Sequence, residues 1–279
     1  MNIAEWLKHA RARLTETGCP DPDIDARWIA EEGLGMTRQA LVFESDRAIP
    51  MSRLIRLESM LDRRAAGEPV QYILGSADFM GLRFKVDDAV LIPRQDTETL
   101  VEAALIDLRQ RPGQPALLDL CTGSGCVGLS LASLAPHARV TLSDLSPEAL
   151  EIARANQRAL GLKVDVRQGD LFAAVAGERF DVITANPPYI PSGELEGLQR
   201  EVRFEPRIAL DGGADGLDFY RRIADGASDH LAPGGALFLE VGVGEAPAVL
   251  ELLKSRVPCA QAGTVKDLTG VERVVYGKI

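Results

Sequence analysis

The stretch Ala116-Leu-Leu-Asp-Leu-Cys-Thr-Gly-Ser-Gly-Cys-Val-Gly128 decides the fold of this 279-residue chain. A buried strand over 116–120 is followed by Gly123, Gly125 and Gly128, and a helix is expected to begin among them. Glycine allows a tight strand-to-helix turn because it adopts backbone conformations that other residues avoid. The spacing Gly-x-Gly-x-x-Gly is also the fingerprint of a dinucleotide-binding turn. The loop alone therefore fits either a structural turn or a ligand-binding turn.

Helical and strand-like segments alternate after this loop. Helical patterns cover 100–108, 127–134, 147–160 and 217–231, and strand patterns cover 116–120, 139–144, 164–167, 180–185 and 236–241. This alternation predicts a Rossmann-like, mostly parallel sheet with helices on both faces. Two last strands over 260–265 and 272–276 predict a C-terminal antiparallel hairpin, which is unusual for a dinucleotide-binding sheet.

The beginning of the chain has the pattern of a small helical bundle instead. Apolar residues recur at the spacing of one buried helix face: Ile3, Trp6, Leu7, Ala10 and Leu14. Asp21 and Pro22 predict the cap and first turn of a second helix, where the missing N–H of proline does no harm. Further helices are expected over 37–43 and after Pro50.

Between these regions the sequence predicts a hairpin, with strands over 79–86 and 89–92 joined by a turn at Asp87-Asp88. We therefore expect three parts: a helical domain over 1–67, a β-hairpin connector over 68–94 and an α/β domain over 95–279.

Composition and charge narrow the class of protein. No apolar run approaches the roughly 18 residues of a membrane span, and no secretion signal is visible. The four cysteines form no Cys-x-x-Cys pair, so reduced thiols in the cytoplasm are expected. The net charge of −10, from 31 basic and 41 acidic residues, argues against a nucleic acid as the main partner, because such binding depends largely on phosphate contacts.

Acidic residues end the next two expected strands. Asp144 follows the glycine loop by about twenty residues, where a carboxylate can accept hydrogen bonds from both ribose hydroxyls. That position fits a nucleotide and a nucleoside such as S-adenosylmethionine equally well. Asp170 could accept from an adenine amino group while Leu171 covers the ring, although a loop or cap role is equally compatible with Asp170.

The segment Asn186-Pro187-Pro188-Tyr189 directly follows the expected fourth strand. A strand terminator would explain one proline, but not Asn before two prolines and Tyr after them. The Asn186 side-chain oxygen and the Pro187 carbonyl can each accept an N–H from a planar amide or amine and stabilise its developing positive charge. Tyr189 offers a ring face to that group. This predicts a methyltransferase acting on a planar nitrogen, with no metal required.

Several segments over nearly the whole chain resemble the PrmC/HemK family of release factor glutamine methyltransferases. They are Glu68-Pro-Val-Gln-Tyr-Ile-Leu-Gly, Leu91-Ile-Pro-Arg-Gln-Asp-Thr-Glu, Asp119-Leu-Cys-Thr-Gly-Ser-Gly, Asn186-Pro-Pro-Tyr-Ile, Val202-Arg-Phe-Glu-Pro and Leu210-Asp-Gly-Gly-Ala-Asp-Gly-Leu-Asp-Phe-Tyr. The motif Asn-Pro-Pro-Tyr is shared with DNA and RNA amino-methyltransferases, so the connector and the Arg-Phe-Glu-Pro segment point to this family.

The resemblance implies methyl transfer from S-adenosylmethionine to the side-chain nitrogen (N5) of glutamine in the Gly-Gly-Gln motif of class I peptide chain release factors, with S-adenosylhomocysteine as the second product. It implies that the helical domain grips the release factor. The implied catalytic residues are Asn186, Pro187, Pro188 and Tyr189. The implied cofactor site comprises Cys121, Thr122, Gly123, Ser124, Gly125, Asp144, Asp170, Leu171 and Asn186.

The sequence departs from the family pattern in three places: Cys121 where glycine is frequent, Gln95 where proline is frequent, and Leu171 where an aromatic ring can cover the adenine. Two alternatives stay open. One is a nucleic-acid amino-methyltransferase acting on adenine or guanine, and the other is a non-enzymatic module that binds S-adenosylmethionine or NAD.

Overall fold

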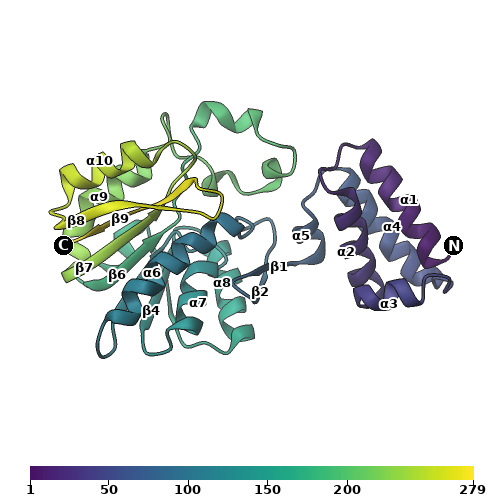
Figure 1. Cartoon of the computed structure of the whole chain (residues 1–279), viewed down its shortest axis with the longest axis horizontal. Helices are drawn as coiled ribbons and strands as arrows, with labels where there is room; N and C mark the ends of the chain where they lie inside the picture. The colour runs from purple at the N-terminus through teal and green to yellow at the C-terminus, as the bar shows by residue number, and fades with distance from the viewer. The chain divides into compact units, whose positions relative to one another are not determined.

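The structure, a computed structural model, describes residues 1–279 and divides into two compact units (Figure 1). The first contains Met1–Ser76 together with Gln199–Phe204, and the second contains Ala77–Leu198 and Glu205–Ile279. The first unit thus extends past the expected boundary at residue 67 and includes a short segment from the second half of the sequence. No helix combines the length and the apolar character needed to cross a bilayer.

The first unit is a helical bundle. Its helices are α1 (Ile3–Glu16), α2 (Pro22–Leu34), α3 (Arg38–Phe43), α4 (Met51–Ala65) and α5 (Val70–Leu74), with a 3-10 turn η4 (Val202–Phe204). Trp6, Leu14 and Ile29 are fully buried in its core. Asp21 occupies the N-cap position of α2 and Pro22 its first turn, as expected, although the Asp21 side chain makes no capping hydrogen bond.

A buried arginine joins the segment Gln199–Phe204 to the bundle. The Arg64 guanidinium lies 2.6 Å from an Asp25 carboxylate oxygen and 2.9 Å from a Glu201 carboxylate oxygen. The Arg64 side chain is 5% exposed, so it would be an uncompensated buried charge without these carboxylates.

The connector hairpin lies earlier in the chain than the sequence predicts. Strands β1 (Ser76–Phe79) and β2 (Leu82–Lys85) pair, and their two-residue turn uses Met80 and Gly81 at φ 50° and 73°, as tight hairpin turns require. The predicted strand over 89–92 is wrong. There the Asp87 carboxylate accepts from the Ala89 N–H at 3.1 Å, which bends the chain locally instead of extending it.

The second unit is built around a seven-stranded sheet with the order β5-β4-β3-β6-β7-β9-β8. Its strands are β3 (Ala116–Leu120), β4 (Arg139–Asp144), β5 (Asp165–Gln168), β6 (Phe180–Ala185), β7 (Leu231–Glu240), β8 (Gln261–Lys266) and β9 (Glu272–Lys278). The strands from β5 to β7 are parallel, and β9 runs antiparallel to both β7 and β8. The predicted mostly parallel sheet with a C-terminal antiparallel hairpin is confirmed.

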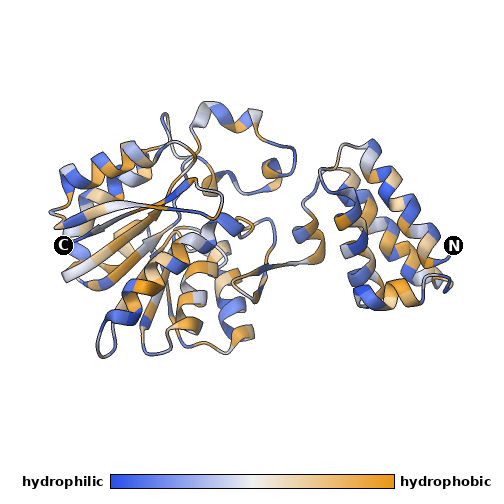
Figure 2. Cartoon of the chain, in the orientation of Figure 1, coloured by the Kyte–Doolittle hydropathy of each residue, from blue (hydrophilic) through white to orange (hydrophobic).

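Helices cover both faces of this sheet (Figure 1). The helices on one face are α6 (Glu98–Gln110), α7 (Cys126–Leu134) and α8 (Pro147–Leu160), and those on the other are α9 (Asp218–His230) and α10 (Ala246–Arg256). Figure 2 shows the central strands as mostly hydrophobic, because both of their faces are buried. Successive residues of β7 alternate between the two cores, with Leu237 and Leu239 in one and Ala236 and Phe238 in the other.

The register brings distant parts of the sequence together at the carboxyl edge of the sheet. Leu120 at the end of β3 lies beside Ser143 of β4 and Ala185 of β6, and Ala185 lies beside Leu239 of β7. The chain continues from β3 into α7 on one face of the sheet and from the neighbouring strand β6 toward α9 on the other face. Such a switch point leaves a crevice for ligands. The residues that follow these strands therefore surround one place.

Candidate functional site

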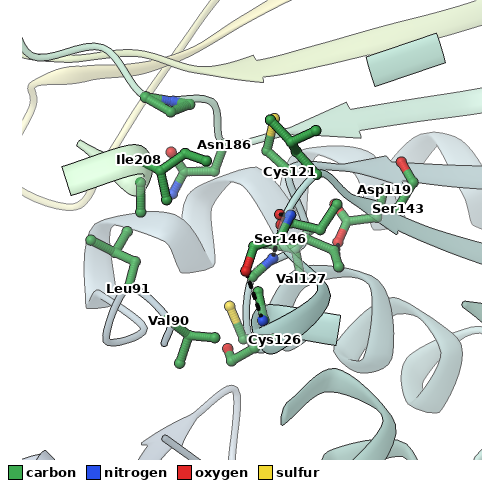
Figure 3. A pocket seen from close by; sticks show the side chains of 18 of the residues that line it. Val90, Leu91, Asp119, Cys121, Cys126, Val127, Ser143, Ser146, Asn186 and Ile208 are labelled. Carbon is green, nitrogen blue, oxygen red and sulfur yellow. Dashed lines mark hydrogen bonds between the residues drawn. The ribbon is translucent and has the colours of Figure 1, made fainter. Parts of the chain in front are cut away.

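A cavity lies at this carboxyl edge and encloses about 980 Å³ including its open mouth. Figure 3 shows Leu91, Cys121 and Asn186 around it. Nine of the expected site residues line the cavity: Cys121, Thr122, Gly123, Ser124, Asp144, Asp170, Leu171, Asn186 and Pro188. Gly125, Pro187 and Tyr189 are outside this lining.

A buried carboxylate holds the glycine loop in place. Asp119 accepts from the Thr122 hydroxyl at 2.5 Å, from the Thr184 hydroxyl at 2.8 Å and from the Gly128 N–H at 3.1 Å. Burial nevertheless raises the Asp119 pKa to about 6. A Cβ on Gly128 would lie 2.1 Å from Leu142, so the third glycine of the motif serves close packing of helix against strand.

Gly123 and Asp144 form the wall of the cavity. A Cβ on Gly123 would meet no atom within 4 Å, so bare backbone faces open space there. The Asp144 carboxylate accepts from the Gly123 N–H at 2.8 Å and from the Ser146 N–H at 3.0 Å. These bonds use one oxygen each and leave further lone pairs, since a carboxylate offers about four acceptor sites.

Two of the departures from the family pattern have unusual backbone conformations. Cys121 has φ 54° and Leu171 has φ 49°, a left-handed region that only glycine enters without strain. The frequent glycine at the position of Cys121 is thereby explained by conformation. Leu171 is 8% exposed and lines the cavity, where it presents an apolar surface.

The charged residues of the cavity lining are mainly acidic. Asp119, Asp144 and Asp170 belong to it, with Arg94 as the one basic residue. The pKa of the Cys121 thiol lies well above its usual value because of burial, with further contributions from these three carboxylates. The cavity is thus better suited to a cation than to a phosphate group.

Asp170 also has a partner outside the lining. Its carboxylate lies 2.7 Å from the Arg222 guanidinium, and both side chains are about half exposed. An exposed pair of this kind is weak, so the carboxylate can exchange this partner for a ligand group.

Asn186 begins the turn after β6 and points its amide inward. Its Nδ2 donates to the Thr97 hydroxyl oxygen at 3.3 Å. Pro187 and Pro188 are buried. The Tyr189 ring packs beside Gly242, where an added Cβ would lie 3.1 Å from it, and burial raises the Tyr189 pKa to about 12. The Tyr189 ring is thus packed against Gly242 and does not line the cavity in this structure.

Sequence reasoning missed Glu240, the last residue of β7. It is 3% exposed, and burial raises its pKa to about 7, although hydrogen bonds with Thr97 and Asn186 and the charge of Arg273 counteract this. The signal in the sequence was a glutamate at the end of the apolar run Ala236-Leu-Phe-Leu, because buried strands rarely contain an ionisable side chain.

The raised pKa of Glu240 predicts how the free energy of unfolding depends on pH. The native state retains a proton on Glu240 that the unfolded chain releases between about pH 4.5 and 7, so ionisation of Glu240 lowers the free energy of unfolding as pH rises through that window. Glu240→Gln does not titrate. We expect the variant to gain stability relative to the parent between about pH 5 and pH 8, by about 1 kcal/mol or more. Denaturant unfolding of both proteins measures this difference, and a difference independent of pH would show that the native pKa is ordinary.

Known proteins share both parts of this architecture. Residues 5–75 match the PrmC N-terminal domain and residues 97–199 match the methyltransferase small domain. A methyltransferase structure from Pyrococcus furiosus has the fold, with a TM-score of 0.52 and 20% identity, over 71% of this chain and 89% of that one.

Two relatives have a higher sequence identity to this chain, over nearly its whole length. The release factor glutamine methyltransferase of Geobacter sulfurreducens is 43% identical over 278 residues, covering 99% of this chain and 96% of the relative. That of Moorella thermoacetica is 42% identical over 275 residues, covering 98% and 97%. The expected resemblance is confirmed: the chain belongs to the release factor glutamine methyltransferase family.

Proposed function

We propose that this protein transfers a methyl group from S-adenosylmethionine to the side-chain amide nitrogen (N5) of the glutamine in the Gly-Gly-Gln motif of class I peptide chain release factors. The observation that carries the proposal is the orientation of Asn186. Its amide nitrogen donates inward to Thr97, so its amide oxygen is left to accept a hydrogen bond at the cavity.

The cavity suits S-adenosylmethionine by its chemistry. Asp144 has spare acceptor sites for two ribose hydroxyls, and Leu171 is an apolar wall for the adenine ring. The acidic lining favours a ligand that carries a positively charged sulfonium and an ammonium group. The same lining would repel the pyrophosphate of a dinucleotide such as NAD.

The chain supplies orientation and electrostatic stabilisation. S-adenosylmethionine supplies an already activated methyl group. The Asn186 side-chain oxygen and the Pro187 carbonyl accept the two N–H groups of the substrate amide. These bonds align its nitrogen and become stronger as positive charge develops there. No residue needs to remove a proton before attack, so alignment provides most of the rate enhancement.

The helical unit, by this proposal, provides recognition of the release factor. A glutamine between two glycines offers little surface, so specific binding requires contacts far from the reacting atom. Such remote contacts can hold the glutamine in the reactive orientation. The unit over Met1–Ser76 contributes no residue to the cavity lining, which leaves it free for this role.

Mass spectrometry tests the function directly. Purified release factor is incubated with enzyme and S-adenosylmethionine, digested, and searched for a Gly-Gly-Gln peptide that is heavier by one methyl group. A release factor whose Gln is replaced by alanine is the matched control. A methyl group elsewhere on the release factor, or none at all, would overturn the proposed substrate.

Asp144 tests the cofactor part of the proposal. Losing a hydrogen bond to a charged group costs about 1.5–3 kcal/mol, so we expect Asp144→Ala to weaken S-adenosylmethionine binding roughly ten- to a hundred-fold. Isothermal titration calorimetry measures the affinity. Asp165→Ala, at an exposed carboxylate on the neighbouring strand, is the control. Equal affinities for the two variants would place the ribose elsewhere.

A further inference from the structure

The side-chain amide of Asn186 can point in two ways that have almost the same shape. Only one of them presents the oxygen to the substrate amide, and the other presents an NH₂ group to the substrate NH₂ group, where two donors would oppose each other. Catalysis by Asn186 therefore depends on whatever fixes this orientation.

Thr97 is the first group that does so. It lies where the 3-10 turn η1 (Gln95–Thr97) leads into α6, and it is 2% exposed. Its hydroxyl oxygen accepts from Asn186 Nδ2 at 3.3 Å. A hydroxyl can also donate to Asn186 Oδ1, so Thr97 alone does not choose between the two orientations.

Glu240 removes this ambiguity. The pairing of Leu239 with Ala185 places Glu240 beside Asn186, and interactions with Thr97 and Asn186 both lower the pKa of the Glu240 carboxyl group. Its second carboxylate oxygen is buried and has no partner. An ionised carboxylate only accepts hydrogen bonds, so the ionised form of Glu240 favours the orientation in which the Thr97 hydroxyl and the Asn186 NH₂ group turn their protons toward it. The Thr97 oxygen is then left to accept the other N–H.

We propose that Glu240, acting with Thr97, is a positioning residue that turns the Asn186 amide nitrogen into the protein and its oxygen toward the substrate. The proposal rests on the proposed methyl transfer. It also accounts for a carboxyl group retained at the end of a buried strand, where an apolar residue would avoid the penalty of burying a charge.

Glu240 can be replaced without leaving a neighbouring charged side chain unpaired. Arg273 is near Glu240 but has its own partners, Asp96 at 2.8 Å and Asp267 at 3.0 Å. Replacing Glu240 by methionine, which is similar in length, therefore leaves no arginine unpaired. If Glu240 were merely a buried charge, Glu240→Met would be neutral or stabilising and would retain activity.

We expect Glu240→Met to lower kcat on a release factor about ten-fold or more, the effect of losing one charged hydrogen bond, with KM for S-adenosylmethionine unchanged. Glu240→Gln retains one acceptor oxygen and should be impaired less. Thr97→Val should lower kcat in the same way. Thr141→Val, at a buried threonine of β4 outside the cavity lining, is the matched control and should match the parent.

The decisive measurement combines Glu240→Met with Asn186→Ala. If Glu240 acts through Asn186, adding Glu240→Met to Asn186→Ala should change kcat less than two-fold, because the group being positioned is already absent. If the two substitutions instead lower kcat by the product of their separate effects, Glu240 does not act through Asn186. A Glu240→Met enzyme with full activity and a normal melting temperature would also overturn the positioning role. A parent enzyme that forms no methylglutamine would instead refute the proposed function.

Discussion

Asn186→Ala is expected to lower kcat on a release factor by about a hundred-fold or more, the usual effect of removing one preorganised polar partner of a transition state. The lost group is the side-chain oxygen that we propose accepts from the substrate amide. Without it the amide nitrogen is less well aligned, and its developing positive charge loses one of two stabilising contacts. The affinity for S-adenosylmethionine should fall much less, because Asp144 and the glycine loop are unchanged.

Single-turnover kinetics and calorimetry separate these two effects. The first gives the rate of methyl transfer with all release factor bound, and the second gives the affinity for the methyl donor. Asn186→Ala should lower the first and largely spare the second. A parallel collapse of both would make Asn186 a cofactor-binding residue and would contradict the mechanism.

Deletion of residues 1–76 is expected to lower kcat/KM on an intact release factor by a hundred-fold or more, which corresponds to about 2.7 kcal/mol. The reason is the loss of contacts remote from the reacting glutamine. A short Gly-Gly-Gln peptide cannot make such contacts, so the deletion should hardly change its already slow methylation. The cavity lining is drawn from the second unit alone, so S-adenosylmethionine binding should persist.

Four rates test this division of labour: intact and truncated enzyme, each with release factor and with peptide. Circular dichroism and S-adenosylmethionine binding establish that the truncated protein is folded. If truncation slows both substrates equally, the helical unit only stabilises the catalytic unit. Glu201→Gln in the intact enzyme controls for the loss of the Glu201 partner Arg64.

Sequence patterns predicted the sheet well because its strands are buried on both faces and are bounded by glycine and proline. The run from Ala116 to Gly128 and the segment after Ala185 could be assigned to strand ends without any structure. Parallel pairing then places these strand ends at the same edge of the sheet. This is why Asp144, Asp170 and Asn186 could be placed at one site from the sequence.

The features that the sequence did not predict depend on individual contacts, which hydrophobic and turn patterns do not record. The turn at Met80-Gly81 was overlooked because methionine is unusual at a positive φ, whereas Asp87-Asp88 has the composition of a turn. Helices α5 and α10 were also not predicted, since α5 is only five residues long and α10 lies between two segments assigned to strands. Glu240 was treated as an ordinary strand residue, because its role depends on its proximity to Asn186, which follows the neighbouring strand β6.

The segment Gln199–Phe204 has a consequence for how the protein is made. The bundle is formed almost entirely by Met1–Ser76, yet the segment that completes it lies some 120 residues further along the chain, beyond most of the parallel sheet. A ribosome adds about 5–20 residues each second, so the nascent bundle waits on the order of ten seconds for this segment. During that interval Arg64 has Asp25 but lacks Glu201. The helices of the bundle are therefore synthesised before the sheet, but the ion pair between Arg64 and Glu201 forms only after the turn at Asn186 has been synthesised.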